Sequence, residues 1–241
     1  MSARGLPRPG LIQSGVFVAG TDTGIGKTHV ACALLHALRN AGLRATGMKP
    51  VASGCARTRE GLRSQDALAL IEASDPQPDY ASCNPYAFEP AIAPHLAAAD
   101  AGARIELAPI ENACAHLAAH ADCVVVEGVG GWMVPLSETL EAADIPRRLN
   151  LPVVLVVGLR LGCINHARLS ARAVLDDGCD LLGWIGNAMD PAMDRSGDTL
   201  AGLRRLLPAP CLGVLAHGVA PAEAARGGAL ADALRALRDR P

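Results

Sequence analysis

Short apolar runs alternate with longer stretches of helical periodicity along most of the chain. The apolar runs, typical of strands buried on both faces of a sheet, cover residues 16–20, 44–51, 122–128, 153–158, 181–187 and 211–217. Stretches in which apolar residues recur every three or four positions predict helices at 28–42, 66–74, 109–121, 164–178, 196–207 and 224–239. This alternation predicts an α/β fold of three layers, in which a mostly parallel sheet is covered by helices on both faces.

Two segments fall outside that alternation. Residues 1–14 combine Pro, Gly and Arg without a period, and we interpret them as a flexible N-terminal extension of a single domain covering 15–241. The proline-rich stretch 75–96 also lacks a clear period and is predicted to be a long connection. Long connections in compact domains tend to be functional.

Composition narrows the classes of function. Half of the residues are hydrophobic but only 2% are aromatic, so Leu, Val, Ile and Ala must fill the core. The net charge of −2 argues against nucleic-acid binding. Without a secretory signal or an apolar run of about 18 residues, we expect a cytoplasmic protein that does not span a membrane. None of the eight cysteines forms a CxxC pair, which favours reduced thiols over a zinc site.

Lysine is almost absent from the chain. All but two of the 22 basic residues are arginines, and the two lysines are Lys27 and Lys49. A planar guanidinium cannot replace a compact ammonium in a tight phosphate or carboxylate site, so lysines that survive such a bias indicate specific requirements. Chance survival at two surface positions is the weaker explanation, because both lysines lie in glycine-flanked loops after apolar runs.

The loop that contains Lys27 has the features of a phosphate site. GTDTGIGKTHV, residues 20–30, joins a predicted strand to a predicted helix. Glycines let backbone N–H groups face an anion, the helix N-terminus adds positive potential, Lys27 neutralises phosphate, and the Thr28 hydroxyl can bind Mg²⁺. Five residues separate Gly20 from Gly26, one more than in the usual pattern. A turn that only joined strand to helix would not need Lys-Thr at the helix start.

A second lysine loop follows the second predicted strand. KPVASG, residues 49–54, begins at the same edge of the sheet as the first loop, where ligands of open α/β sheets bind. Lys49 is therefore placed to face the γ-phosphate from the side opposite Lys27. Ser53 either orients a substrate or serves as a turn hydroxyl that caps the backbone.

Three more polar residues stand at the ends of predicted elements. Glu127 is placed as a carboxylate beside a nucleotide's Mg²⁺, before glycines that allow close backbone approach; the alternative is an exposed glutamate in a flexible turn. Asp66 is either a metal ligand or an acid favoured by the helix dipole. Asn187 either contacts adenine through its amide or simply ends a strand.

The histidines do not form a recognisable site. His29, His36, His116 and His120 fall in predicted helices without a repeated ligand spacing. We therefore assign neither a zinc site nor a histidine base to them.

Five segments, taken in chain order, resemble one enzyme family. They are GTDTGIGKT, KPVASG, NPYAF with the following APH, VVVEGVGGWMVPLS, and LPVVLVVGLRLGCINH with its GWIGN continuation. Together they closely resemble the dethiobiotin synthetases, which act at the penultimate step of biotin synthesis, and the likeness runs from about residue 15 to about residue 215. The longer phosphate loop is itself a trait of that family. The resemblance implies an α/β fold of the P-loop NTPase type.

The resemblance also implies a reaction, that of an ATP- and Mg²⁺-dependent ligase that forms C–N bonds. Its substrates would be 7,8-diaminopelargonic acid, CO₂ and ATP. One amine takes up CO₂ as a carbamate, ATP phosphorylates the carbamate to a carbamic-phosphoric anhydride, and the second amine closes the ring of dethiobiotin and expels phosphate. Such chemistry needs positioning and charge neutralisation more than covalent help from the protein.

Roles for individual residues follow from the same resemblance. Lys27 would bind the β- and γ-phosphates, and Lys49 would stand between the carbamate and the γ-phosphate as the second catalytic lysine. Mg²⁺ would be held by Thr28, Asp66 and Glu127. The residues expected to contact ATP are Gly24, Ile25, Gly26, Lys27, Thr28, His29, Asp66, Glu127, Gly128, Val129, Gly130, Asn187, Ala188 and Glu223. Those expected to contact the diamine are Thr23, Ser53, Gly162, Cys163 and Asn165.

A homodimer with the active site at its interface is a further implication of the resemblance. Gly162, Cys163 and Asn165 open a predicted helix, and they would bind the substrate carboxylate from the neighbouring subunit, as suits a helix N-terminus. The chain departs from the family at two places. Gly24 stands where some relatives have glutamate, and Ala-His-Gly at 216–218 replaces a Pro-Trp-Leu-like stretch that lines the adenine pocket.

Two other functions are weighed against the ligase. A P-loop switch of the partition or metallocluster-loading type would bind protein partners, but such ATPases carry an extra lysine near the loop start, where this chain has Thr21 or Asp22. A P-loop domain reduced to a binding module would have no reason to retain Lys27 and Lys49.

Overall fold

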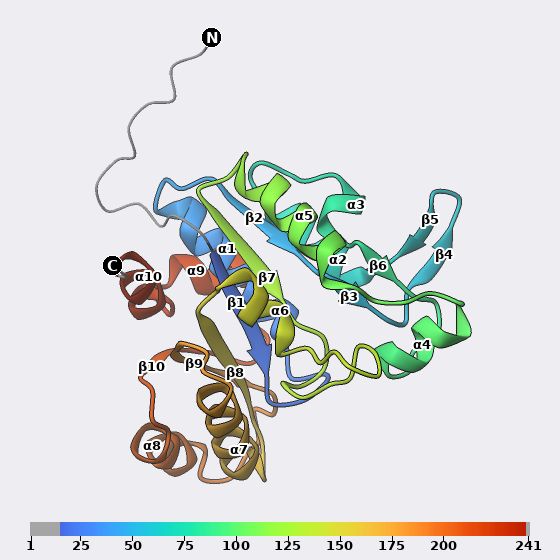
Figure 1. Ribbon diagram of the computed structural model, residues 1–241. Helices are drawn as coiled ribbons and strands as arrows, with labels where there is room; N and C mark the ends of the chain where they lie inside the picture. The colour runs from blue at the N-terminus through green and yellow to red at the C-terminus, as the bar shows by residue number, and fades with distance from the viewer. Residues whose placement is uncertain (1–14, 240–241) are drawn as a thin grey trace.

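The sheet at the centre of the molecule has six parallel strands. The computed structural model describes residues 15–239, so the predicted extension 1–14 lies outside the described residues. The strands follow the order β10-β9-β8-β1-β7-β2, and each neighbouring pair is parallel (Figure 1). Their bounds are β1 Gly15–Gly20, β2 Ala45–Met48, β7 Cys123–Glu127, β8 Val153–Leu159, β9 Leu181–Ala188 and β10 Cys211–Leu215. The six predicted apolar runs correspond to these six strands.

Helices cover both faces of the sheet, and this arrangement confirms the predicted three-layer α/β fold. One core lies between the sheet and α1, α2, α9 and α10, and the other lies between the sheet and α5 to α8. Alternate residues of β1 enter opposite cores: Val16 and Val18 the first, Phe17 and Ala19 the second. The helices are α1 Lys27–Asn40, α2 Gln65–Ala73, α3 Tyr80–Cys83, α4 Pro94–Asp100, α5 Leu107–Ala118, α6 Asp144–Leu149, α7 Cys163–Asp176, α8 Ser196–Leu206, α9 Pro221–Arg226 and α10 Ala231–Arg238.

Two predicted elements are interrupted in the structure. The predicted strand 44–51 leaves the main sheet after Met48, and its last residue begins β3 (Val51–Ala52), which pairs with β6 (Tyr86–Ala87). The predicted helix 224–239 is wrong as a single element. It is divided into α9 and α10 near Gly228, whose φ of +74° no helix accommodates.

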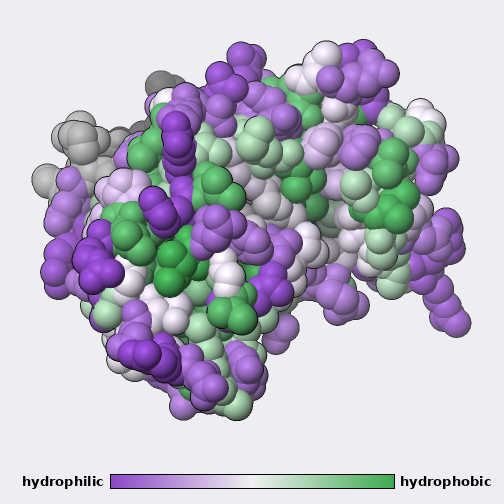
Figure 2. Space-filling model, turned by 90° about the horizontal axis from the view of Figure 1, so that it is seen from below, coloured by the Kyte–Doolittle hydropathy of each residue, from purple (hydrophilic) through white to green (hydrophobic). Residues whose placement is uncertain are grey.

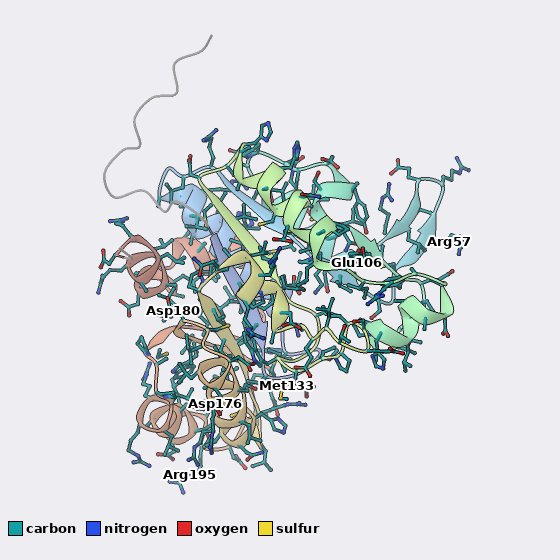
Figure 3. All side chains as sticks on the ribbon, viewed as in Figure 1. Arg57, Glu106, Met133, Asp176, Asp180 and Arg195 are labelled. Atoms are coloured by element: carbon teal, nitrogen blue, oxygen red, sulfur yellow. The ribbon has the colours of Figure 1, made fainter. Side chains whose placement is uncertain are left out.

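Short elements were invisible to the periodicity. The stretch 75–96 holds α3, β6 and the first turn of α4, none of which is long enough there to show a repeat. A hairpin of β4 (Ala56–Thr58) and β5 (Gly61–Arg63) projects from the body of the molecule, with Arg57 on its first strand (Figure 3). Among residues 15–239, no helix has both the length and the apolar character that a membrane crossing requires.

Strand order brings three loops together at one edge of the sheet. Because β1, β7 and β2 are neighbours and parallel, the segments that follow Gly20, Glu127 and Met48 all leave the sheet at the same edge. Figure 2 shows the molecule from this side, where polar and apolar patches surround an indented surface. Ligands of open α/β sheets bind at the carboxyl ends of the strands, so a binding site is expected at this edge.

Candidate active site

Glycines in left-handed backbone conformations shape the loop between β1 and α1. Gly24 has a φ of +73° and Gly26 a φ of +86°. A Cβ atom at Gly26 would lie 2.1 Å from Nδ2 of Asn187, and that amide nitrogen donates to the Ile25 carbonyl at 2.9 Å. The end of β9 therefore holds the loop in place. The first N–H groups of a helix lack partners within it, so the turn that begins at Lys27 offers donors and positive potential to an anion.

The ammonium group of Lys27 is buried beside this loop. The residue is 6% exposed, and Nζ donates to the Asp22 carbonyl at 2.8 Å. Burial, reinforced by the charge of Lys49, lowers the pKa of Lys27 to about 8. An anion close to Nζ would favour the charged form, so this lysine suits a phosphate ligand.

A second buried ammonium lies between two carboxylates. Lys49 Nζ contacts Glu127 Oε1 at 2.6 Å and Asp66 Oδ2 at 2.8 Å, and it donates to the Gly128 carbonyl at 3.1 Å. Lys49 is 3% exposed and Glu127 is 1% exposed, whereas the Asp66 side chain is 46% exposed. The contact exists because Lys49 follows β2 and Glu127 ends the adjacent β7.

These three charges set one another's protonation. Burial by itself would lower the pKa of Lys49, but Glu127 and Asp66 raise it above its usual value. Burial opposes the ionisation of Asp66, yet Lys49 holds the pKa of that carboxyl below its usual range. Burial prevails at Glu127 and raises its pKa in spite of Lys49. The Lys49 ammonium is therefore the stable cation of the cluster.

Three oxygen-bearing side chains converge beside Lys49 in a way that fits Mg²⁺. Thr28 Oγ1 donates to Glu127 Oε1 at 2.9 Å, while the buried Oε2 of Glu127 has no hydrogen-bond partner among the described residues. Hydroxyl and carboxylate oxygens are the ligands that Mg²⁺ prefers, and a nucleotide's phosphates and water normally complete its shell. Among residues 15–239, no group of three His, Cys, Asp or Glu is arranged to hold a metal, and Thr28, Asp66 and Glu127 provide only two carboxylates.

A cavity of about 690 Å³ opens beside these groups. Eleven of the residues predicted from the sequence line it: Thr23, Gly24, Gly26, Lys27, Thr28, Lys49, Ser53, Asp66, Glu127, Val129 and Gly130. Ala52, Val134 and residues 91–94 complete the wall. The sequence prediction missed the contribution of 91–94. These residues lie within the proline-rich connection 75–96, which was expected to be functional, and its APH stretch is part of the family-like segments.

A second, more open hollow of about 390 Å³ lies where β9 and β10 end. It is lined by three predicted nucleotide contacts, His29, Asn187 and Ala188, together with Met189 and residues 216–221.

Three other predicted ATP contacts lie outside both linings. Glu223 is exposed on α9. Ile25 is buried in the core, where a Cβ atom at Gly158 would lie 2.9 Å from its side chain. Gly128 directs its carbonyl at Lys49.

The predicted carboxylate contacts occupy a different part of the surface. Gly162, with a φ of +91°, is the N-cap of α7; Cys163 is buried and Asn165 is exposed. None of these three residues lines either of the two hollows described above. The leucines nearby are unusually exposed, Leu161 by 98% and Leu169 by 60%. Within one chain, therefore, the start of α7 does not join the two lysines.

Gly26 and Gly24 make a matched pair for testing the loop. We expect Gly26→Ala to weaken ATP binding far more than Gly24→Ala, because both substitutions strain a left-handed backbone by about 1–2 kcal/mol but only the first collides with Asn187. At Gly24 a Cβ would meet no atom within 4 Å. Isothermal titration of each variant with ATP measures the difference. Equal affinities would show that Asn187 does not constrain the loop.

A family model and several curated relatives match most of the chain. The profile of a family described as an AAA domain matches residues 14–218. An ATP-dependent dethiobiotin synthetase from Xanthomonas euvesicatoria pv. vesicatoria (strain 85-10) is 60% identical over 197 residues, which are 82% of this chain and 88% of the relative. Another from Xylella fastidiosa (strain 9a5c) is 56% identical over 212 residues, covering 87% of this chain and 94% of the relative.

Among solved structures, a ParA family ATPase from Chlorobium tepidum TLS matches over 94% of this chain and 98% of its own, with a TM-score of 0.54. At 14% identity this likeness shows the fold alone. The likeness to the synthetases shows more than the fold, because more than half of the aligned residues are identical over most of both chains. The chain belongs to the family of ATP-dependent dethiobiotin synthetases.

Proposed function

We propose that this protein joins CO₂ to 7,8-diaminopelargonic acid with ATP and Mg²⁺, giving dethiobiotin, ADP and phosphate. The observation that carries the proposal is the position of Lys49, buried between Glu127 and Asp66 in the wall of the cavity that Lys27 also lines. Two ammonium groups on one cavity suit a reaction that brings two anions together, a carbamate and the γ-phosphate. Membership of the synthetase family supplies the identity of the product.

The reaction consists of three bond-forming steps. An amine nitrogen of the diamine adds to the carbon of CO₂ and loses a proton, which gives the carbamate. A carbamate oxygen takes the γ-phosphoryl group of ATP, and the electron pair of the broken P–O bond leaves with ADP. The second amine then adds to the carbonyl carbon, the C–O bond to phosphate breaks, and the ring closes with loss of phosphate and a proton.

The two lysines divide the task of neutralising charge. Lys27 would exchange its single contact with the Asp22 carbonyl for oxygens of the β- and γ-phosphates. Lys49 would direct its ammonium at the oxygens between which the phosphoryl group moves, where charge develops during transfer. Because Glu127 and Asp66 hold the Lys49 ammonium in its charged form, the cation is already present when the substrates arrive.

Mg²⁺ would be held by Thr28, Asp66 and Glu127. When bound, the ion would draw charge from the β- and γ-phosphate oxygens. Glu127 would present its buried Oε2, which is otherwise without a hydrogen-bond partner among residues 15–239. Thr28 stands at the start of α1, next to Lys27, so one helix turn positions both the hydroxyl and the phosphate-binding ammonium.

The substrate would be held by two subunits. Thr23 and Ser53 line the cavity and would contact the diamine or its carbamate, with the backbone of 128–130 nearby. The carboxylate of the diamine substrate would be bound by the neighbouring subunit of a homodimer, at the start of its α7, by Gly162, Cys163 and Asn165. The exposed Leu161 and Leu169, and Met133 with 64% exposure after β7 (Figure 3), are apolar surface that a second subunit would cover.

Adenine would occupy the hollow lined by His29, Asn187 and Ala188. His217, in the segment that departs from the family pattern, lies there with Nδ1 at 3.3 Å from the Ala188 carbonyl. The amide nitrogen of Asn187 donates to the Ile25 carbonyl at 2.9 Å and to the Met189 sulfur at 3.3 Å, so its carbonyl oxygen is the group that would accept from the base. We place the enzyme in the cytoplasm, where ATP and CO₂ are supplied and the eight thiols remain free.

Dethiobiotin formation is the direct test of the function. We expect the purified protein, with diaminopelargonic acid, bicarbonate and Mg²⁺-ATP, to release dethiobiotin that mass spectrometry detects, together with equimolar phosphate. Omitting the diamine is the control and should abolish most ATP turnover. ATP hydrolysis that is indifferent to the diamine, with no product, would remove the proposal.

Lys49→Arg tests the second lysine. The guanidinium is too large and too flat for a buried position between two carboxylates at 2.6 and 2.8 Å, so we expect kcat to fall by about 100-fold or more. Nucleotide affinity should change little, because Lys27 and the loop are retained. Steady-state kinetics and ATP titration of the folded variant measure the two quantities. Normal turnover would place Lys49 away from the reacting atoms.

Asn165→Ala tests the shared site. We expect a higher KM for the diamine and an unchanged KM for ATP, because Asn165 does not line the nucleotide cavity of its own chain. Arg172→Ala, two turns further along α7 and 82% exposed, is the matched control and should leave both values unchanged. Light scattering should show a dimer at assay concentration. An active monomer would contradict the shared site.

A further inference from the structure

A partly buried chain of hydrogen bonds links the two segments that carry Asp66 and Lys49. The hydroxyl of Tyr80 accepts from the backbone N–H of Ser64 at 2.6 Å and donates to Asn84 Oδ1 at 2.9 Å. The amide nitrogen of Asn84 in turn donates to the Lys49 carbonyl at 2.6 Å and to the Tyr86 carbonyl at 3.1 Å. Asn84 is only 3% exposed, and each polar group of its side chain is used in this chain of contacts.

Both ends of this chain lie next to groups of the candidate site. Ser64 is the N-cap of α2, where its hydroxyl accepts from the N–H of Ala67, and Asp66 stands in the first turn of that helix. At the other end, the N–H of Lys49 donates to the Cys83 carbonyl at 2.7 Å, so the end of α3 contacts the Lys49 backbone at both its N–H and its carbonyl.

Ala67 and Leu70 pack α2 into the core, but the Asp66 side chain itself is not held by packing. Its side chain is 46% exposed, and its contact with Lys49 at 2.8 Å depends on where α2 begins. The Tyr80 hydroxyl accepts a hydrogen bond from the backbone N–H of Ser64, the N-cap residue of α2. A carboxylate that is free to drift on a half-exposed helix start would be a poorer metal ligand, since outer contacts orient the groups that bind a metal.

We propose that Tyr80 and Asn84 are positioning residues, which hold the start of α2 and the Lys49 backbone in register so that Asp66 and the cluster around Lys49 bind Mg²⁺ with nucleotide. This inference rests on the proposed function for the role of Mg²⁺. Neither residue touches the cavity, and neither carries charge to it. Tyr80 and Asn84 affect metal binding indirectly, because they fix the position of Asp66 relative to Lys49.

Tyr80→Phe removes one hydroxyl and leaves the rest of the ring, over which the Arg63 guanidinium lies 4.2 Å from the centroid. We expect the Mg²⁺ concentration for half-maximal binding of a fluorescent ATP analogue to rise by about 10-fold or more, as loss of outer contacts to metal ligands does elsewhere. Nucleotide affinity in EDTA should stay the same. Fluorescence titration with Mg²⁺ at fixed nucleotide measures both.

Tyr86→Phe is the matched control, because it removes the only other tyrosine hydroxyl of the chain. That hydroxyl also makes two hydrogen bonds, donating to the Glu106 carbonyl at 3.3 Å and accepting from the Glu106 N–H at 3.1 Å. Glu106 immediately precedes α5 (Figure 3), and this contact does not include Ser64 or Asp66. Both variants should lose some thermal stability, but only Tyr80→Phe should change the Mg²⁺ dependence.

Asn84→Ala provides a second variant, with the same expected direction and a check of folding by circular dichroism. If it does not fold, Tyr80→Phe alone decides. A Mg²⁺ dependence of Tyr80→Phe equal to that of Tyr86→Phe and of the unaltered protein would overturn the positioning role, even while dethiobiotin is formed. Absence of dethiobiotin from the unaltered protein would instead remove the proposed function, and the binding titration would still judge Tyr80.

Discussion

The buried contact between Lys49 and Glu127 is the constraint on which the rest of the site depends. Two charges taken out of water are costly unless each is closely paired, and removing either leaves the other uncompensated. The parallel sheet makes the pairing automatic: Met48 of β2 is in register with Val126 of β7, and the next residue of each chain segment is Lys49 or Glu127. A shift of one position between these strands would separate the charges.

Because of the same pairing, the Lys49 ammonium already has partners of opposite charge before any ligand binds. In the free protein the Lys49 ammonium lies where it satisfies Asp66 and one oxygen of Glu127. In the proposed reaction, Mg²⁺ bound with nucleotide would replace the ammonium as the partner of these carboxylates, and Lys49 would then be available to a phosphoryl or carbamate oxygen. One cation would thus take the place of another, so that the carboxylates would keep a positively charged partner.

The central fold was predictable because its strands are apolar on both faces and its long helices repeat regularly, as β8 and α1 illustrate. The placement of Lys27, Lys49 and Glu127 at one edge followed from parallel strands alone. Periodicity could not reveal very short elements or contacts between residues far apart in the sequence. The two-residue strands β3 and β6 carry no repeat, and the hydrogen bond from Asn84 to the Lys49 carbonyl joins residues 35 positions apart, which no local pattern connects. The last helix is different, because the consecutive Gly227 and Gly228 are a turn signal in the sequence, and the predicted helix 224–239 extends across it.

The scarcity of lysine has a chemical consequence beyond phosphate binding. Both side-chain amines of the chain lie in the walls of one cavity, and the one in the phosphate loop has a pKa of about 8, so a substantial share of it is uncharged and nucleophilic in mildly alkaline solution. Acylating reagents therefore find no lysine side chains on the outer surface to consume them. Acylation of lysine side chains therefore reports the occupancy of a single cavity, while the α-amino group reacts independently of it.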